Sequence, residues 1–438
     1  MSMLPMPVSA PSLPLRYPFP PGPMGTPPLV IHWARKHHPV CPVLLPSGAS
    51  AWMLTRKNDI TAVLADRRFS RTLAFEGAPR IVGEDFTAVA GSLFNVDPPD
   101  HTRIRQILAP YYTRSATEGY RELVTGLVDE VLDTMAQGPN PCDLMDTFAG
   151  PLPPLIACTI LRVPADIREK VVEKFAAQTS FVTDAVEVAE ATAAVADFTR
   201  QVIDIRHEDE ERDDPIGALV TAHEHGVISR DELYGTASYL IVTGVESLVS
   251  PMATGPLTLL RHRHQLIRCQ KEPALWPRAA EEILRYHHNG VLGLPRIALE
   301  DVELHGTRIR RGEAVCATML GATWDPAHYR NPAKFDIDRQ ENADPTFGAG
   351  PHYCLGAHQA RMALTIAYRA LFDLFPTLEL AVSEREITWD TASMFIRPAA
   401  LPVVWRDQKT AVKNSRSAQH HAQPYQLPAP GRSTNRHG

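Results

Sequence analysis

Residues 347–356 read Phe-Gly-Ala-Gly-Pro-His-Tyr-Cys-Leu-Gly, and they place one cysteine, Cys354, in a loop framed by glycines. The next segment, residues 357–370, is rich in alanine, leucine and arginine and has few helix breakers, which predicts a helix. Cys354 is therefore expected just before a helix N-terminus, where exposed N–H groups and the positive end of the helix dipole favour a thiolate. Gly356 has no side chain, so a flat group has room to lie against this helix.

A lone cysteine is usually a small buried core residue, and structural zinc sites use several Cys or His ligands at close spacing. The other cysteines, at positions 41, 142, 158, 269 and 316, form no Cys-x-x-Cys pair, which argues against zinc. The glycines around Cys354, the histidine two residues before it and the helix after it argue against the core interpretation. A thiolate flanked by amide donors and facing an open surface suits an iron ligand.

The loop resembles the haem-binding loop of the cytochrome P450 family, Phe-Gly-x-Gly-x-His-x-Cys-x-Gly. The chain matches every fixed position of that pattern, with Phe347, Gly348, Gly350, His352, Cys354 and Gly356. Residues 356–361 also resemble soluble bacterial members, and the similarity spans roughly residues 30–405. This resemblance implies that the cofactor is haem b (iron protoporphyrin IX) and that Cys354 is the ligand of its iron.

The fold prediction is a single large domain, because no Gly/Ser-rich linker, repeat or change of composition interrupts about residues 30 to 405 of the 438-residue chain. Helical patterns dominate, among them a long apolar helix within Arg230–His262 and a helix at Trp276–Tyr286, while strand-like segments are short. We expect a mainly α fold with minor β (α+β), which is the P450 fold with small antiparallel β-sheets. The predicted parts are a proline-rich N-terminal segment (1–29), a haem-thiolate catalytic domain (30–406) and a disordered C-terminal tail (407–438).

Composition narrows the function classes. The net charge of −6 and the absence of a Lys/Arg block argue against a nucleic-acid partner. The first 25 residues contain no apolar run of 18, so neither a membrane anchor nor a signal peptide is expected. The six cysteines show no pairing pattern, which fits a reducing compartment and a cytoplasmic location.

Two charged residues, Glu282 and Arg285, stand three apart on the predicted helix Trp276–Tyr286 and share a face. Alone, they would be read as a surface ion pair. In a chain with Cys354, they resemble the Glu-x-x-Arg motif of the P450 family, which is buried and completed by an arginine shortly before the haem loop. Arg339 occupies that position, so the resemblance implies a structural triad of Glu282, Arg285 and Arg339.

The two haem propionates need cationic partners. His101 and Arg105 lie four apart after Pro98-Pro99-Asp100 and resemble the family pattern Asp-Pro-Pro-x-His-x-x-x-Arg. The resemblance assigns the propionate-binding positions to His101, Arg105, Arg296 and His352. Each of these residues taken alone would be read as a surface charge.

The oxygen-activating element is expected at residues 243–247, Thr-Gly-Val-Glu-Ser, inside the long apolar helix. The family pattern has an acid followed by an alcohol here, so that a hydroxyl can relay protons and a carboxylate can recharge it through water. The resemblance therefore makes Glu246 and Ser247 the catalytic pair. Ser247 stands where threonine is usual, and the competing interpretation is a helical serine bonded to the carbonyl one turn back.

The resemblance implies a monooxygenase that inserts one oxygen atom from O2 into a small organic substrate, expected to be a secondary-metabolite intermediate. Oxidative coupling or desaturation without oxygen insertion is the alternative, and a haem-thiolate sensor is a third. The chain has no room for a flavin or iron–sulfur domain, so ferredoxin and ferredoxin reductase are the expected electron donors. We expect a cationic docking face around Arg103, His352 and His358, and pocket walls at residues 74–94, 178–183, 239–243, 290–294 and 393–396.

Overall fold

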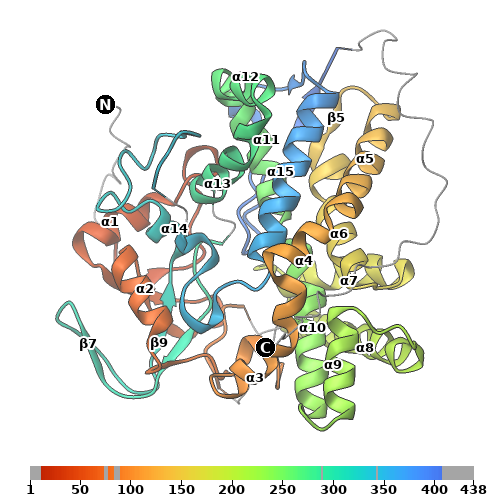
Figure 1. The fold of residues 1–438 in the computed structure, drawn as a ribbon. Coiled ribbons are helices and arrows are strands. Elements are labelled where there is room, and N and C mark those ends of the chain that lie inside the picture. Colours follow the sequence, from red (N-terminus) through yellow and green to blue (C-terminus); the bar gives the residue numbers. More distant parts are fainter. Residues whose placement is uncertain (1–10, 74–76, 83–88, 288–289, 342–343, 407–438) are drawn as a thin grey trace, which may run out of the picture.

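The computed structural model describes residues 11–73, 77–82, 89–287, 290–341 and 344–406, and helices make up most of them (Figure 1). The helices are α1 (Leu29–His37), α2 (Lys57–Ala65), α3 (Asp100–Leu108), α4 (Arg114–Gly119), α5 (Arg121–Gln137), α6 (Leu152–Ile160), α7 (Ala165–Gln178), α8 (Ala185–Glu208), α9 (Pro215–Glu224), α10 (Arg230–Glu246), α11 (Val249–Arg261), α12 (Arg263–Lys271), α13 (Trp276–Tyr286), α14 (Met319–Thr323) and α15 (Ala357–Leu374). The predicted mainly helical fold is confirmed, and α13 has the predicted bounds.

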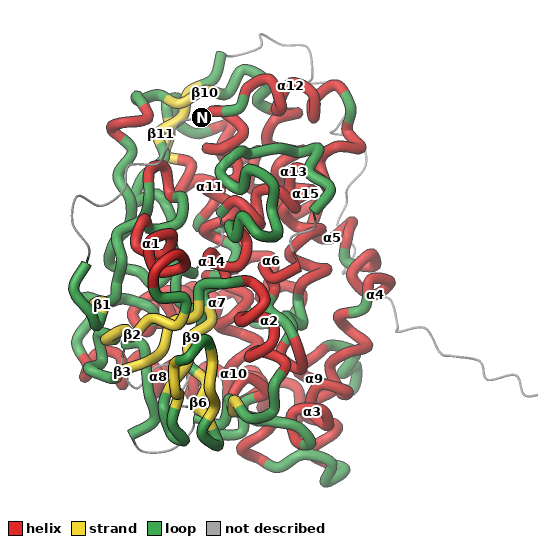
Figure 2. Tube along the Cα trace, turned by 90° about the vertical axis from the view of Figure 1, so that its left-hand side faces the viewer, coloured by secondary structure: helices red, strands yellow, loops and turns green. Residues whose placement is uncertain are grey.

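The strands form a six-stranded sheet in the order β1-β2-β3-β9-β6-β4, a three-stranded sheet in the order β10-β11-β5, and the β7–β8 hairpin. Their bounds are β1 (Leu15–Arg16), β2 (Val40–Leu44), β3 (Ser50–Leu54), β4 (Phe69–Ser70), β5 (Cys142–Asp143), β6 (Arg296–Ala298), β7 (Val302–Leu304), β8 (Thr307–Ile309), β9 (Ala314–Ala317), β10 (Glu379–Leu380) and β11 (Pro402–Val404). Figure 2 shows β1, β2, β3, β9 and β6 side by side, away from the β10–β11 pair.

The largest sheet is mixed, which corrects the expectation of antiparallel sheets. β1 runs parallel to β2, and β3 runs parallel to β9. The chain between β3 and β9 includes the helices from α2 to α13, so it is long enough for the crossover that a parallel pair requires. The remaining pairs in this sheet are antiparallel.

Part of the N-terminal segment packs on the domain. β1 pairs with β2, and the rings of Tyr17 and Phe19 are buried at 6% and 7% exposure. Part of the segment predicted as residues 1–29 therefore lies against the domain predicted as residues 30–406. The predicted tail, residues 407–438, lies outside the described residues.

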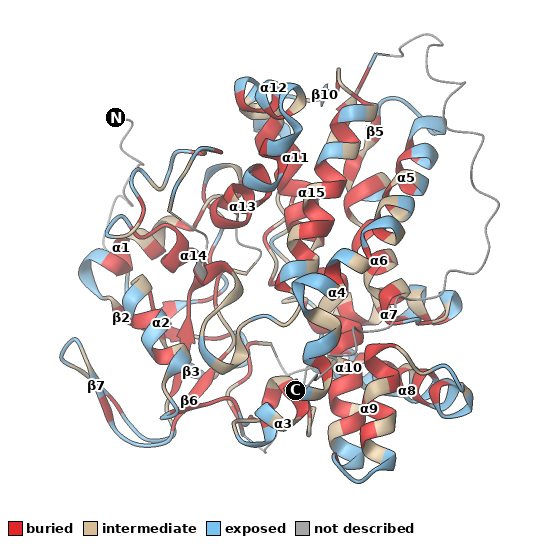
Figure 3. Ribbon diagram, viewed as in Figure 1, coloured by how far each residue is buried: buried red, intermediate tan, exposed pale blue. Residues whose placement is uncertain are grey.

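The long apolar helix is divided in two, with α10 ending at Glu246 and α11 beginning at Val249. Pro251, in the first turn of α11, has no N–H to donate to the carbonyl of Ser247 one turn earlier, which favours a break here. The run Arg230–Arg261 is long and apolar enough to cross a membrane by composition alone, but 78% of its most apolar window is buried inside the protein. The two consecutive helices α10 and α11 therefore form the centre of the core (Figure 3).

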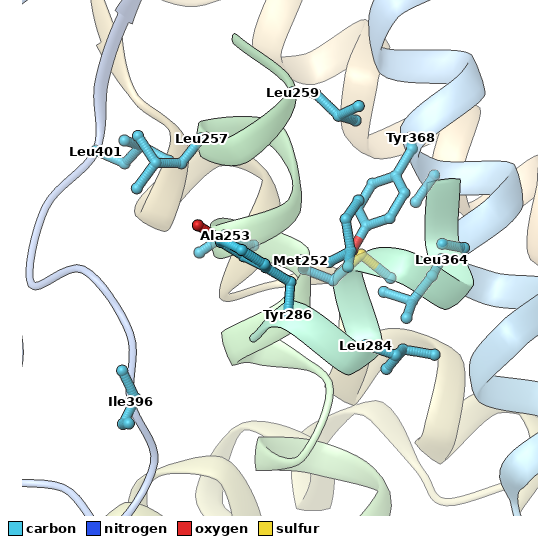
Figure 4. Close-up of a cluster of buried hydrophobic side chains, with 14 of the residues drawn as sticks. Met252, Ala253, Leu257, Leu259, Leu284, Tyr286, Leu364, Tyr368, Ile396 and Leu401 are labelled. Carbon is cyan, nitrogen blue, oxygen red and sulfur yellow. The ribbon is translucent and has the colours of Figure 1, made fainter. Parts of the chain in front are cut away.

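The core beside the site is built where α11, α13 and α15 meet. Met252, Leu284, Leu364 and Tyr368 are all buried there and gather from these three helices (Figure 4). The Tyr368 hydroxyl donates to the carbonyl of Pro251 at 2.6 Å, so its only polar atom is satisfied. This packing holds the helix after Cys354 against the central helix.

Candidate active site

The loop that carries Cys354 is held against helix α2. The backbone N–H of Cys354 donates to the carbonyl of Phe347 at 2.9 Å, which closes the loop on itself. Gly350 has a φ of +69°, and a Cβ there would lie 2.4 Å from the carbonyl oxygen of Leu64 in α2. Glycine at this position is required both by the backbone conformation and by the close approach of α2.

Cys354 faces a cavity of about 340 Å³ between its loop and helix α10. The loop side is lined by Phe347, Cys354 and Gly356, and the helix side by Tyr239, Gly244 and Ser247. A Cβ on Gly356 would meet only the side-chain oxygen of Gln359, at 3.9 Å, so this wall is open to the cavity. The cavity has the position and the walls that a flat group bound to Cys354 needs.

The surroundings of the Cys354 thiol act in both directions on its pKa. Burial is the largest cause and raises the pKa, while the Gly356 amide, Arg105 and Arg361 lower it. The expectation that the helix N-terminus makes a thiolate is therefore only partly met, because desolvation outweighs the favourable dipoles in the protein alone. The thiol is solvent-accessible from the cavity side although protein encloses it elsewhere. Coordination to a metal ion would remove the proton outright.

The four predicted propionate-binding residues converge from three parts of the chain, α3, β6 and the turn before Cys354. The rings of His101 and His352 lie 4.2 Å apart, and the buried Nε2 atom of each has no hydrogen-bond partner among the described residues. Among the described residues, Arg296 donates to the carbonyl of Phe69 alone, at 3.2 Å, and Arg105 forms no ion pair. Burial and nearby arginines lower the pKa of His101 to about 4. The unpartnered Nε2 atoms of His101 and His352, together with the guanidiniums of Arg105 and Arg296, fit the two carboxylates of haem.

The predicted triad is assembled. Arg285 donates to the Glu282 carboxylate twice, at 2.7 and 2.8 Å, and Arg339 Nε lies 3.1 and 3.2 Å from its two oxygens. All three side chains are at most 6% exposed. Arg285 also donates to the carbonyl of Thr323 at 3.1 Å, and the adjacent Trp324 packs on the ring of Tyr286. The triad thereby ties α13 to the segment that leads into the Cys354 loop.

Glu246 and Ser247 face different cavities. Ser247 lines the Cys354 cavity, and its hydroxyl donates to the carbonyl of Thr243 at 2.7 Å, the contact expected of a helical serine. Glu246 is 4% exposed and lines a second cavity of about 720 Å³ with Arg397 and Asp390. Adjacent residues on a helix point about 100° apart, which explains the division. Burial raises the pKa of Glu246, and Arg397 lowers it.

Gly244 lies where α10 packs against α6. A Cβ at this position would lie 2.8 Å from the Cβ of Ala157, so glycine lets α6 pack closely on α10. The close contact holds the wall of the Cys354 cavity in place.

Sequence reasoning missed Arg397. It donates to the carboxylate of Glu246 and lies 3.2 Å from that of Asp390, so it connects α10 to the C-terminal part of the chain. The sequence signal was weak, because Arg397 simply follows the predicted pocket wall 393–396.

The predicted wall 393–396 is joined to two other predicted walls by isolated β-bridges. Ser393 pairs with Ser180 of wall 178–183, and Phe395 pairs with Gly290 of wall 290–294. Residues 74–76 and 83–88 of the first wall lie outside the described residues.

The expected docking cation Arg103 is engaged within the protein. Its guanidinium lies 2.6 Å from Glu232 and 2.9 Å from Asp100, and it also donates to the carbonyl of Val227. Arg103 thus connects α3 to the N-terminus of α10, and its charge is compensated. The expectation that it offers a free positive charge is wrong, because the sequence could not show that Glu232 lies beside it.

Comparisons with known proteins agree with this site. The family profile described as Cytochrome P450 matches residues 143–399. Nocardicin C N-oxygenase of Nocardia uniformis subsp. tsuyamanensis is 36% identical, covering 85% of this chain and 94% of its own. Mycinamicin IV hydroxylase/epoxidase of Micromonospora griseorubida is 35% identical, covering 84% and 92%. The crystal structure of SgvP, involved in the tailoring step of griseoviridin, superposes with a TM-score of 0.84 at 30% identity, over 90% of this chain and all of that one. The chain therefore belongs to the cytochrome P450 family of haem-dependent monooxygenases.

Proposed function

We propose that this protein inserts one oxygen atom from O2 into an intermediate of bacterial secondary metabolism, by hydroxylation or epoxidation. The observation that carries the proposal is that a hydroxyl, on Ser247, lines the same cavity as Cys354. The substrate class is supported by relatives named for nocardicin C and mycinamicin IV, which match over nearly their full lengths. We propose residues 30–406, together with residues 11–29, as the catalytic unit.

The test is turnover under ¹⁸O2 with a substrate found by spectral titration of a compound library. Oxygen insertion predicts one labelled atom in the product. The coupling or desaturation alternative predicts an unlabelled product that is dimeric or dehydrogenated. That product should form without loss of electrons to side reactions. A protein that binds compounds but turns none over would support the sensor alternative.

We propose that Cys354 ligates the haem iron and that His101, Arg105, Arg296 and His352 hold the propionates. The support is the pair of buried Nε2 atoms, on His101 and His352, that have no hydrogen-bond partner within the described residues. Phe347, Gly348, Gly350 and Gly356 shape the loop under the haem. When bound, haem supplies the binding and reductive activation of O2. The side chains then orient the substrate, exclude water and move protons.

Ser247 is proposed to pass protons into the cavity. Its hydroxyl now donates to the Thr243 carbonyl, so it must rotate toward the cavity to donate there. Glu246 is proposed to recharge it from the second cavity, where it is held by Arg397. This division would let protons enter from a different side of α10 than the one that lines the Cys354 cavity.

Replacing Ser247 by alanine is expected to leave substrate affinity nearly unchanged but to lower the product formed per electron, with hydrogen peroxide released instead. Loss of proton relay slows the relayed step by about 10²- to 10⁴-fold. Glu246→Gln should give a weaker form of the defect, because water can partly replace the carboxylate. Stoichiometry of product, peroxide and electrons measures both effects.

The control for this prediction is Ser238→Ala. Ser238 is a buried serine on the same helix that does not line the Cys354 cavity, and its loss should leave the product yield per electron unchanged. Unchanged yield in Ser247→Ala as well would mean that the substrate itself or an ordered water supplies the protons.

We propose that ferredoxin and ferredoxin reductase supply the electrons, with an acidic ferredoxin docking beside α4. Arg114, the first residue of α4, is exposed and forms no ion pair with a described residue. The preceding turn carries Tyr112, which lines the Cys354 cavity, and α4 packs against α15. Arg114 is therefore a better candidate than Arg103 for steering a negatively charged donor.

Arg114→Glu is expected to slow reduction by ferredoxin at low salt, and the wild-type rate should fall as salt rises, because exposed charges are screened over about 8 Å at physiological ionic strength. Stopped-flow reduction measures both. The matched charge reversal Lys170→Glu, on exposed α7, should have no effect. Equal slowing by the two variants would place the effect in the net charge of the protein rather than at α4.

A cytoplasmic location is also proposed. All six cysteines are free thiols, which suits a reducing compartment. Nocardicin C N-oxygenase and mycinamicin IV hydroxylase/epoxidase, which match over nearly their full lengths, are bacterial proteins.

A further inference from the structure

Two buried arginines lie side by side at one end of a strand pair. β4 and β6 pair antiparallel, with Phe69 opposite Ala298 and Ser70 opposite Ile297. The same register places Arg71, the residue after β4, opposite Arg296. The two side chains are only 2% and 5% exposed. Two like charges buried together require negative groups nearby, since a buried charge is stable only when it is paired.

The guanidinium of Arg71 forms no ion pair within the described part of the chain. Its guanidinium donates to the carbonyls of Pro295 and Phe94 and, at 3.4 Å, to the side-chain oxygen of Asn95, all of which are neutral acceptors. Asp97 lies beside Arg71 in space, but its carboxylate accepts the backbone N–H of Arg71 and the hydroxyls of Ser70 and Thr72 rather than an N–H of the guanidinium. A guanidinium has five N–H donors, so part of its capacity remains for a ligand.

Four other residues, His101, Arg105, Arg296 and His352, are proposed above to serve the two propionates, and Arg71 lies near Arg296 and His352 of that cluster. Burial and the neighbouring Arg296 lower the pKa of Arg71 to about 9, so it still carries its charge at neutral pH. Arg71 is therefore a further buried cation beside the proposed cofactor site.

The position of Arg71 points to the substrate. Its guanidinium lies 4.1 Å from the centre of the Phe94 ring, and that ring stacks on Tyr239 with centres 5.2 Å apart. Tyr239 lines the cavity that contains Cys354. Arg71 is thus connected to the Cys354 cavity through the stacked rings of Phe94 and Tyr239. A molecule that extends from the cavity along these two rings would bring its far end to Arg71.

We propose that Arg71 is a specificity-determining residue that binds the carboxylate of an acidic substrate. This inference rests on the proposed function, because it assigns a chemical class to the substrate of the same site. The carboxylate would accept charge-assisted hydrogen bonds from the guanidinium in a site closed to water, where such bonds are strong. The reacting carbon would then lie toward the other end of the molecule, in the Cys354 cavity.

The test uses the haem-loaded protein and alkanoic acids that carry an imidazol-1-yl group at the far end, in a series of increasing chain length. The imidazole binds the iron and gives a spectral change, from which the dissociation constant is read. Each acid is compared with its primary amide, which has the same shape without the charge. At the best length, the acid should bind about tenfold to a hundredfold more tightly than the amide.

Arg71→Gln should abolish this preference, because the acid should bind more weakly while the amide keeps its affinity. Arg71→Lys should retain part of the preference. The control Arg68→Gln changes an arginine three residues earlier whose side chain is 49% exposed and paired with Asp66, and it should keep the full preference. The proposal is overturned by equal binding of acid and amide at every length. It is also overturned if Arg71→Gln keeps the preference, or if it loses haem, which would make Arg71 a cofactor ligand. Failure of oxygen insertion in the ¹⁸O2 experiment would leave the binding preference intact, so the two ideas fail separately.

Discussion

Cys354→His is expected to lose all monooxygenase activity and the long-wavelength band of the reduced carbon monoxide complex for which the family is named. Histidine can still ligate iron, but a neutral imidazole does not donate electron density as a thiolate does. The loop should tolerate the exchange, because Cys354 is open to the cavity and its backbone is held by Phe347 and by the contact of Gly350 with α2. The measurement is the reduced carbon monoxide spectrum together with the haem content.

Cys269→Ala is the matched control for this change. Cys269 is a buried cysteine on α12, away from the Cys354 cavity, and its removal should keep both the band and the activity. A Cys354→His protein that retains the long-wavelength band would show that a different residue ligates the iron.

Glu282→Ala is expected to destabilise the protein by about 3–5 kcal/mol, because it leaves the guanidiniums of Arg285 and Arg339 buried without a counter-charge. Arg285 is 1% exposed and Arg339 6% exposed, so water cannot replace the carboxylate. The lost carboxylate also held the backbone N–H of Asp336 at 2.9 Å, in the segment that leads to the Cys354 loop. Haem content should therefore fall together with the free energy of unfolding in urea.

An exposed ion pair in the same region is the control that tests whether the burial of the triad causes this loss of stability. Arg268 and Asp338 form a pair with two hydrogen bonds at 2.7 and 3.0 Å, but both side chains are 46% exposed. Arg268→Ala should change the free energy of unfolding by less than about 1 kcal/mol, as is usual for solvated pairs. If Glu282→Ala is no more damaging than Arg268→Ala, the triad is not a structural support.

Residues close together in the chain are enough to predict several parts of the protein. The loop around Cys354 follows from a run of ten residues, 347–356, and the helices after it and around Glu282 follow from local composition and spacing. Spacing along one helix also placed Glu282 and Arg285 on one face, and His101 and Arg105 on another. Partners such as Arg339 and Arg296 were found only through a family resemblance, because nothing local connects them to those helices.

Which distant element meets each of these faces could be learned only from the folded structure. It placed Glu246 in a second cavity with Arg397, paired Arg103 with Glu232, and brought Arg71 beside Arg296 through the β4–β6 register. The physical reason is that local spacing sets the direction of a side chain relative to its own helix or strand, whereas its partner is set by how the elements pack. That packing is determined by the whole buried core, which no single stretch of sequence contains.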